Sequence, residues 1–388
     1  MKNRLSKTAC PFICAMSALL SCPSFAQDRP SSTAAAPLAP WTVSATLGEE
    51  SIGQGLPVLA LDRPDWPRYR SDHEATPRAW RSLQAELLAT HPNGWRLGAL
   101  ARAEAWLQAS PDAVTAAALD ATDLEPETGR RYHLDAQSQS WQGRGIKVGT
   151  PWLALDTAKR WHWQADAQLM RLQRLRTVDL SGSLLYRGGD VYDFNLQSQR
   201  SNPGITGPFL GASGSSGLGS SLSVALQGEL APGWRLQLRA DDLLSRLVWP
   251  DLATDAATLD SEVTSRAPDG SLDYAPLVKG QKSLQRVTAR IGTRWQAQAS
   301  WSAFASSGQP GALTLRADRK AGLNQYWLGW DNNETARNRP HWRLEIEPLR
   351  RVASVGLAWR GWHALLATDG KGTGSEFRAL NVGWRTEF

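Results

Sequence analysis

The chain has 388 residues, a formal net charge of +6, 19 tryptophans and 3 cysteines. The cysteines, at positions 10, 14 and 22, all lie near the N-terminus, which excludes disulfides and thiol chemistry from the rest of the chain. The arginines are dispersed, so the charge does not indicate a nucleic-acid interface. Beyond the N-terminal segment, no apolar run approaches the ~20 residues that a membrane helix needs.

Residues 1–26 have the organisation of a secretory signal peptide. Basic residues at positions 2, 4 and 7 precede an apolar stretch, and the small residues at 24–26 predict cleavage after Ala26. A competing interpretation takes Leu19-Leu20-Ser21-Cys22 as a lipoprotein box, for which a leucine directly before the small residue is unfavourable. Because the segment holds three basic and no acidic residues, its removal lowers the formal charge from +6 to +3.

Residues 27–40 are rich in Pro, Ala and Ser without a pattern, and we expect a flexible periplasmic leader there. Residues 41–388 alternate apolar and polar side chains in runs separated by turns, with no domain break. Asn93-Gly94 and Gly188-Gly189 are typical of hairpins, and we expect a further hairpin turn at Gly292-Thr293. The fold class predicted is therefore all-β.

The composition of the strands favours a membrane barrel over a soluble sandwich. Many positions on the apolar face are alanine, the polar face carries Arg, Gln, Asp and Ser, and tryptophans lie mostly near strand ends. Runs of about 9–11 residues match a tilted crossing of the hydrocarbon layer, and Trp is favoured at the membrane–water interface. The chain therefore predicts a transmembrane antiparallel up-and-down β-barrel over 41–388.

The last nine residues alternate strictly and end on an aromatic residue. This pattern resembles the C-terminal signature of Gram-negative outer-membrane β-barrel proteins. The resemblance implies location in the outer membrane, contact with its lipid and insertion by the barrel-assembly machinery. The residues that would form this assembly signal are Leu380, Val382, Trp384 and Phe388.

The number of strands follows from a count of alternating runs and from parity. Nineteen runs can be distinguished, but an even number is needed if both termini lie in the periplasm, with long loops outside. Merging 361–375 into an external loop gives 18 strands. Removing also the weak runs near 113–120 and 146–155 gives 16. We therefore expect about 16–18 strands, with long external connections at 48–79, 200–219 and 248–282.

A barrel of this size holds an aqueous channel or a plugged lumen. The predicted function is a porin-like channel for small hydrophilic solutes, with a preference for anions if wall arginines line it. The alternative is a sealed barrel that serves as a structural or assembly partner of a surface or secretion system. The arginines expected to line the pore are Arg96, Arg102, Arg235, Arg239, Arg286, Arg290 and Arg316.

The sequence offers no catalytic constellation. His162 and Asp166 are four apart on a strand, roughly 13 Å by the usual rise, which is too far for a direct hydrogen bond. Asp369 to Glu376 resembles a calcium loop only faintly, because Lys371 takes a ligand position. No Walker, dinucleotide or zinc spacing occurs. We expect no enzyme activity, no cofactor and no metal.

Overall fold

The computed structural model describes residues 41–58, 76–158, 160–189, 191–207, 210–261, 264–266, 272–274, 277–302, 311–332, 339–372 and 375–388. All of these belong to the unit Pro40–Phe388. The predicted signal peptide and the leader at 27–40 lie outside the described residues.

The described residues form a closed antiparallel β-barrel of 14 strands in up-and-down order, which confirms the predicted fold class. Each strand pairs with neighbours on both sides, so closure satisfies the backbone groups of the wall. The strands of the first half of the chain are β1 (Thr42–Gln54), β2 (Arg78–Thr90), β3 (Arg96–Ala109), β4 (Arg131–Gly149), β6 (Trp161–Gly188), β7 (Val191–Ser201) and β8 (Gly217–Ala231). Those of the second half are β9 (Trp234–Asp260), β12 (Val278–Ala289), β13 (Arg294–Trp301), β14 (Ala312–Lys320), β15 (Leu323–Asp331), β16 (His341–Glu347), β17 (Val352–Trp359), β18 (Trp362–Thr368) and β19 (Phe377–Glu387).

Two of the wall strands are each built from two pieces. β7 and β8 run in the same direction along β6, and β12 and β13 run in the same direction along β9. The Gly292-Thr293 segment is therefore a break within one course of the wall, and the hairpin predicted there is wrong. The predicted external loop at 200–219 is also wrong, because its ends belong to β7 and β8 and its middle is bonded to β9 through Gly214 N–Asp251 O at 2.7 Å.

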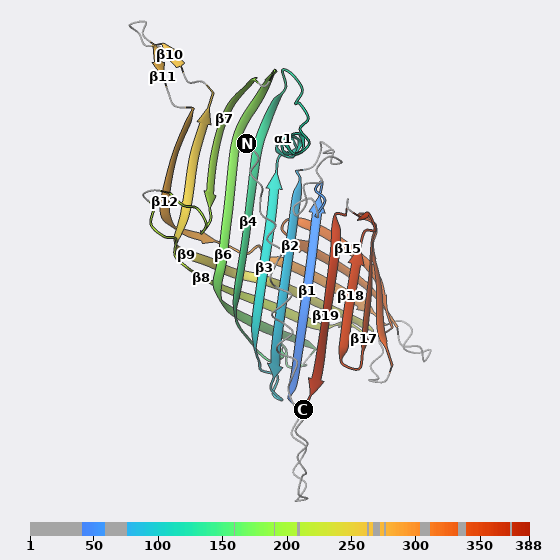
Figure 1. Ribbon diagram of the computed structural model, residues 1–388. Helices are drawn as coiled ribbons and strands as arrows, with labels where there is room; N and C mark the ends of the chain where they lie inside the picture. The colour runs from blue at the N-terminus through green and yellow to red at the C-terminus, as the bar shows by residue number, and fades with distance from the viewer. Residues whose placement is uncertain are drawn as a thin grey trace, which may run out of the picture. The chain divides into compact units, whose positions relative to one another are not determined.

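The barrel closes where the first strand meets the last. Thr42 pairs with Glu387 and Ile52 with Phe377, and the backbone N–H of Phe388 donates to the carbonyl of Trp41 at 2.9 Å. Figure 1 shows β1 in blue beside β19 in red. This register places the start of β1 and the end of β19 at the same end of the barrel, as an even number of strands requires.

The count of 14 corrects the expected 16–18 because some alternating runs are parts of longer strands, and one is a helix. β4, β6 and β9 have 19, 28 and 27 residues, so each contains more than one run of membrane-crossing length. The weak run near 113–120 is helix α1 (Pro111–Ala121), which Ser110 caps by accepting a hydrogen bond from Ala113 N at 3.1 Å. The cap followed by a proline and an acid is a helix-start signal that the alternation analysis overlooked.

The remaining connections are shorter than the sequence suggested. Residues 48–54 belong to β1 and 78–79 to β2, while 248–260 belong to β9 and 278–282 to β12. Beyond β9 lies a small hairpin of β10 (Thr264–Arg266) and β11 (Leu272–Tyr274), and the two-residue β5 (Leu153–Ala154) pairs with β6. Trp359 pairs with Trp362 across a tight turn, so 361–375 is not one loop. Within the described ranges, no helix has the length and apolarity to span a membrane.

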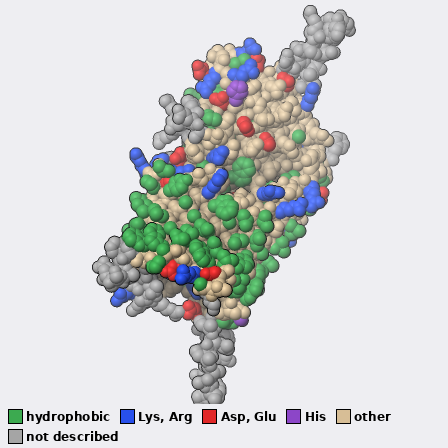
Figure 2. Space-filling model, turned by 180° about the vertical axis from the view of Figure 1, so that it is seen from behind, with side chains coloured by type: hydrophobic (Ala, Val, Ile, Leu, Met, Phe, Trp, Pro, Cys, Tyr) green, Lys and Arg blue, Asp and Glu red, His purple; other side chains and the backbone are tan. Residues whose placement is uncertain are grey.

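The outer face of the wall carries a belt of exposed apolar side chains, seen as a green band in Figure 2. The belt includes Leu97, Ile146, Leu169, Leu238, Leu315, Leu328, Ile346, Val355, Leu366, Leu380 and Val382. Exposed tryptophans follow its edge at the end where the termini lie, and they include Trp95, Trp234, Trp301, Trp342, Trp359 and Trp362. This arrangement confirms an aromatic girdle at that edge.

Candidate functional site: the barrel lumen

Alternation along the strands turns the polar face of the wall inward, where charged side chains pair across strands. On β3 and β6, Arg96 Nη2 lies 2.7 Å from Asp166 Oδ1. On β4, Lys147 Nζ lies 3.0 Å from Glu86 Oε1 and 3.7 Å from Asp166. These side chains are mostly shielded from solvent, and pairing offsets the cost of removing their charges from bulk water.

The most buried network is centred on Arg102 and Asp242, which are 2% and 1% exposed. Arg102 binds the carboxylate with both terminal nitrogens, at 2.8 and 2.9 Å, although three strands separate β3 from β9 in the wall. Ser221 donates to Asp242 at 2.6 Å, and Arg294 reaches its other oxygen at 3.2 Å. A bidentate, charge-assisted pair of this kind is among the strongest protein hydrogen bonds.

Further groups complete the surroundings of Arg102. Gln168 accepts one of its hydrogen bonds at 3.0 Å, and Glu104 lies 3.4 Å away. The indole N–H of Trp80 donates to Glu104 at 2.9 Å, while the guanidinium lies over the Trp141 ring, 5.2 Å from its centroid. The network therefore links side chains from opposite parts of the wall into one bonded layer.

Asp242 occupies its place because β9 is irregular there. Its φ is +56°, and the β8–β9 register shifts between Leu222 and Val224. This bulge directs Asp241 and Asp242 inward in succession, whereas a regular strand would direct one of them to the lipid side. The order polar-polar-apolar-apolar over 241–244 breaks the alternation and is the signal by which the sequence could have revealed it.

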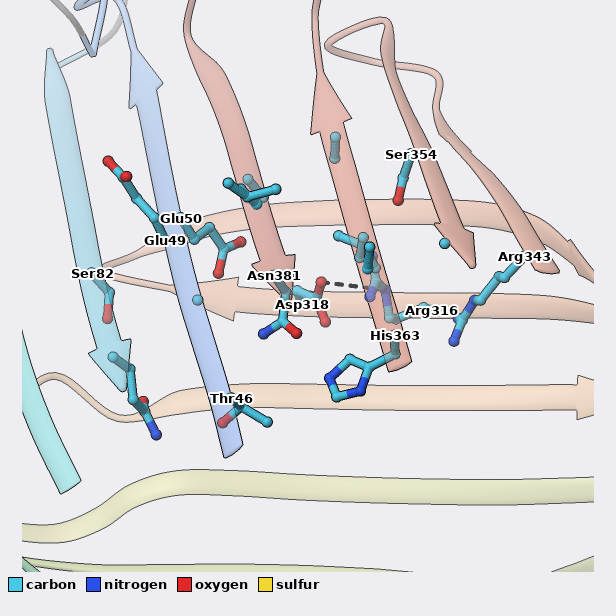
Figure 3. Close-up of a pocket in the computed structure, with 18 of the residues that line it drawn as sticks. Thr46, Glu49, Glu50, Ser82, Arg316, Asp318, Arg343, Ser354, His363 and Asn381 are labelled. Atoms are coloured by element: carbon cyan, nitrogen blue, oxygen red, sulfur yellow. Dashed lines mark ion pairs between the residues drawn. The ribbon is translucent and has the colours of Figure 1, made fainter. Parts of the chain in front are cut away.

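A second group of charges lies on the other side of the lumen. Arg316 is 3.1 Å from Glu345 and 3.4 Å from Asp318, and Arg343 also bonds Glu345. In Figure 3, Arg316 and Asp318 lie between Glu50 on one side and Arg343 on the other. Two more pairs complete the inventory, with Arg239 to Asp241 at 2.9 Å and Lys320 to Glu50 at 2.6 Å.

These charges surround a cavity of about 560 Å³ inside the barrel. Its lining comes from several strands, among them β1, β2, β9, β14, β16 and β19, so the cavity lies between opposite parts of the wall. Among the polar side chains that line it are Thr46, Glu50, Glu86, Arg239, Asp241, Arg294, Arg316, Asp318, Arg343, His363 and Asn381. Because Arg294 also binds Asp242, the cavity adjoins the buried network directly.

Apolar side chains from distant strands meet in the lumen farther from the termini. Trp80 of β2 and Trp327 of β15 belong to one buried cluster, although five strands separate them by the shorter way around the barrel. Phe377 lies against Trp327, with ring centroids 5.6 Å apart. A second buried cluster combines Trp141 with Leu172 of β6 and Trp249 of β9. Trp80 and Trp249 are thus interior residues, so not every tryptophan near a strand end belongs to a girdle at the membrane edge.

The structure places the predicted arginines in different surroundings. Arg96, Arg102, Arg239 and Arg316 turn inward, and all four are ion-paired. Arg235 is exposed and lies on the same face of β9 as Arg239.

Arg286 and Arg290 lie on the opposite face from the one predicted. Val287 and Ala289 pack against the buried cluster around Leu247, which leaves the arginines between them on the outer side. The assignment failed because periodicity defines two faces of a strand but not which one is inner. The interruption between β12 and β13 also prevents extrapolation from the adjacent lipid-facing residues of β13.

Other inward groups were not anticipated from the sequence. Lys147 and Asp242 pair with Glu86 and Arg102, which are 61 and 140 positions away in the chain. Glu345 pairs with Arg343 on its own strand and with Arg316 of β14, and His341 Nε2 lies 2.7 Å from Asp331. Local sequence carries no signal for the pairs of Lys147 and Asp242. Within the described ranges, no group of three or more His, Cys, Asp or Glu side chains is arranged to hold a metal ion.

The closed sheet, its apolar belt and its aromatic edge together decide the class. The architecture is that of an outer-membrane β-barrel protein. No family model matches the sequence, and no curated protein matches it. Among solved structures, the Ralstonia pickettii toluene transporter TbuX is similar at 9% identity and a TM-score of 0.42, covering 90% of each chain. A TodX monoaromatic hydrocarbon channel mutant is similar at 9% and 0.39, covering 90% of this chain and 89% of the other.

Proposed function

We propose that the barrel is a narrow channel for small polar solutes, closed in this state by its own side chains. The observation that carries the proposal is the charge-lined cavity of about 560 Å³ inside a closed membrane barrel. Trp327 lines it and belongs to the buried cluster that includes Trp80, and Arg294 joins it to the network of Arg102 and Asp242. These side chains can change rotamer without breaking the backbone ladder of the wall.

The charges of the lumen support selection by size and hydrogen bonding more than by sign. In the Arg and Lys ion pairs of the lumen described above, the basic groups and the carboxylates are equal in number once Glu104 beside Arg102 is included. Paired charges of opposite sign largely cancel at a distance. A strong preference for anions, which the arginines alone suggested, is therefore not part of the proposal.

Planar-bilayer conductance of the purified protein tests it. Replacement of the bridging indoles, in a Trp80→Ala, Trp327→Ala variant, should raise the conductance or the open fraction relative to the unchanged protein. The matched control is Trp342→Ala, which removes an exposed indole at the membrane edge and should leave conductance unchanged. Under a salt gradient, the reversal potential should stay close to zero. Absence of conductance from both proteins at every voltage and salt concentration would contradict the proposal.

The second candidate is a sealed barrel that acts as a partner in a surface or secretion assembly. The contact of Trp80 with the cluster around Trp327, across the lumen, favours it. In that case neither the unchanged protein nor the double variant conducts, and a reproducible partner protein co-purifies with the folded barrel. Neither candidate function involves catalysis.

The proposal includes export with cleavage after Ala26 and insertion through the C-terminal signal. Leu380 and Val382 face outward on β19, the Trp384 ring centroid lies 6.4 Å from that of Trp362, and Phe388 is 76% exposed. An exposed terminal aromatic next to the closing seam is available to assembly machinery. Deletion of Phe388 should reduce the membrane-inserted fraction, measured by fractionation and heat-modifiable gel mobility, whereas Thr386→Ser should not.

A further inference from the structure

The outer face carries a group of arginines beside its apolar belt, on the side away from the tryptophan edge. Arg171 of β6 lies directly opposite Arg144 of β4, and Arg246 of β9 is the partner of Ser220 on β8. Ala289 of β12 pairs with Leu247 of the antiparallel strand β9. The next residue along β12, Arg290, therefore lies beside the preceding residue of β9, Arg246. We call Arg171, Arg174, Arg176, Arg246, Arg286 and Arg290 the arginine rim.

The arginine rim adjoins apolar surface directly. Two residues from Arg171 along β6 lies Leu169, which is 54% exposed, and two residues from Arg246 lies Leu244, which is 66% exposed. Successive even steps along a strand stay on the same face, so each cation stands at the edge of lipid-facing surface. Figure 2 shows Lys and Arg side chains above the apolar band.

The charges of the rim have no protein counterion in the described part of the chain. All six side chains belong to exposed residues, and no described carboxylate lies within ion-pair distance of any of them. By contrast, Arg81 on the outer face of β2 is paired with Glu49 at 2.7 Å. Like charges placed close together on a sheet are destabilising unless an anion lies between them.

We propose that the arginine rim binds lipids with phosphomonoester headgroups in the leaflet on this side of the membrane. A guanidinium presents a planar fork of donors that fits two phosphate oxygens, and it is the side chain best suited to a repeated phosphate surface. The adjoining Leu169 and Leu244 contact the acyl chains of the same lipid. The two edges of the belt thus differ in chemistry, with indoles on one side and phosphate-binding arginines on the other.

Native mass spectrometry of the purified full-length protein in a neutral detergent tests the proposal. Phosphatidic acid, phosphatidylserine and phosphatidylcholine are each added as probes, and phosphatidic acid should remain bound best. An Arg171→Gln, Arg246→Gln, Arg290→Gln variant should bind it about 100-fold more weakly, if each arginine contributes about fivefold at a membrane surface. A control variant carries Arg131→Gln, Arg160→Gln and Arg385→Gln, all exposed elsewhere, and should bind normally.

The proposal is independent of conduction, because a sealed barrel would bind the lipid equally well. Equal retention of the three lipids by the unchanged protein would overturn it, even if the rim variant failed to fold. Equal loss in the rim and control variants, compared after gel mobility shows both barrels folded, would overturn it too. Displacement of phosphatidic acid by an equal concentration of glycerol 3-phosphate would overturn the lipid assignment, because it would indicate a site for soluble anions.

Discussion

Arginines inside the barrel and arginines on its outer rim show how the two faces of one wall treat the same side chain. Arg102 is almost completely buried and bonds both oxygens of Asp242, whereas Arg171 and Arg246 are exposed without a carboxylate partner among the described residues. A buried cation requires a fixed counterion, because water is not available to it. An exposed cation can use water or lipid phosphate. Burial, and not residue type, therefore decides whether an arginine needs a carboxylate of the protein as its counterion.

The largest effect is expected where the buried pair is broken. Asp242→Ala leaves the guanidinium of Arg102 without its main partner and should reduce the free energy of unfolding by about 3–5 kcal/mol. Urea unfolding of the barrel in detergent micelles measures it. The matched control is Asp241→Ala, whose carboxylate pairs with the more exposed Arg239 and should cost less. Equal losses would mean that burial does not separate the two sites.

The next effect tests which face of β13 meets lipid. Ala297 faces outward between Leu238 and Ala317, and Ala297→Arg should cost about 2–4 kcal/mol if it lies at mid-depth. Gln296→Arg introduces the same side chain on the inner face, opposite Asp318, and should cost little. The measurement is unfolding free energy in phospholipid bilayers. A larger loss for Gln296→Arg would reverse the assigned faces.

A smaller effect is expected for a half-shielded pair in the lumen. Asp166→Asn removes the charge that Arg96 and Lys147 share, and should cost about 1.5–3 kcal/mol, toward the lower end because Lys147 keeps Glu86. In a Glu86→Gln background, Asp166→Asn also removes the remaining carboxylate beside Lys147. The loss of unfolding free energy caused by Asp166→Asn should therefore be larger there than in the unchanged protein. An unchanged loss would show that the carboxylates do not share the lysine.

The smallest effect concerns the exposed outer pair. A double-mutant cycle of Arg81→Gln and Glu49→Gln should give a coupling of about 0.2–1 kcal/mol, because both side chains are more than 40% exposed. The coupling should shrink as salt is raised. A coupling as large as that between Arg102 and Asp242 would remove the distinction between buried and exposed pairs.

Local sequence was sufficient where a residue's environment depended only on its strand and its face. The alternation from Leu380 to Phe388 predicted the last strand, and Asn93-Gly94 predicted the β2–β3 turn. Alternation was not sufficient at β12, where the strand was predicted correctly but its inner face was misassigned. It also missed α1, because the helix-start signal of Ser110 and Pro111 is not part of an alternating pattern. Of the predicted lumen arginines, Arg96, Arg102, Arg239 and Arg316 turn inward, whereas Arg286 and Arg290 lie on the outer face of β12.

The amino-acid sequence by itself determined the period of two, the apolar and polar faces and the aromatic edge, because these depend on neighbours one or two residues apart. Only the tertiary structure decided the number of strands, the inner face of β12 and the partners of each charge. Arg102 and Asp242 are 140 positions apart. They meet because the wall curves back on itself, and strand periodicity contains no information about that curvature.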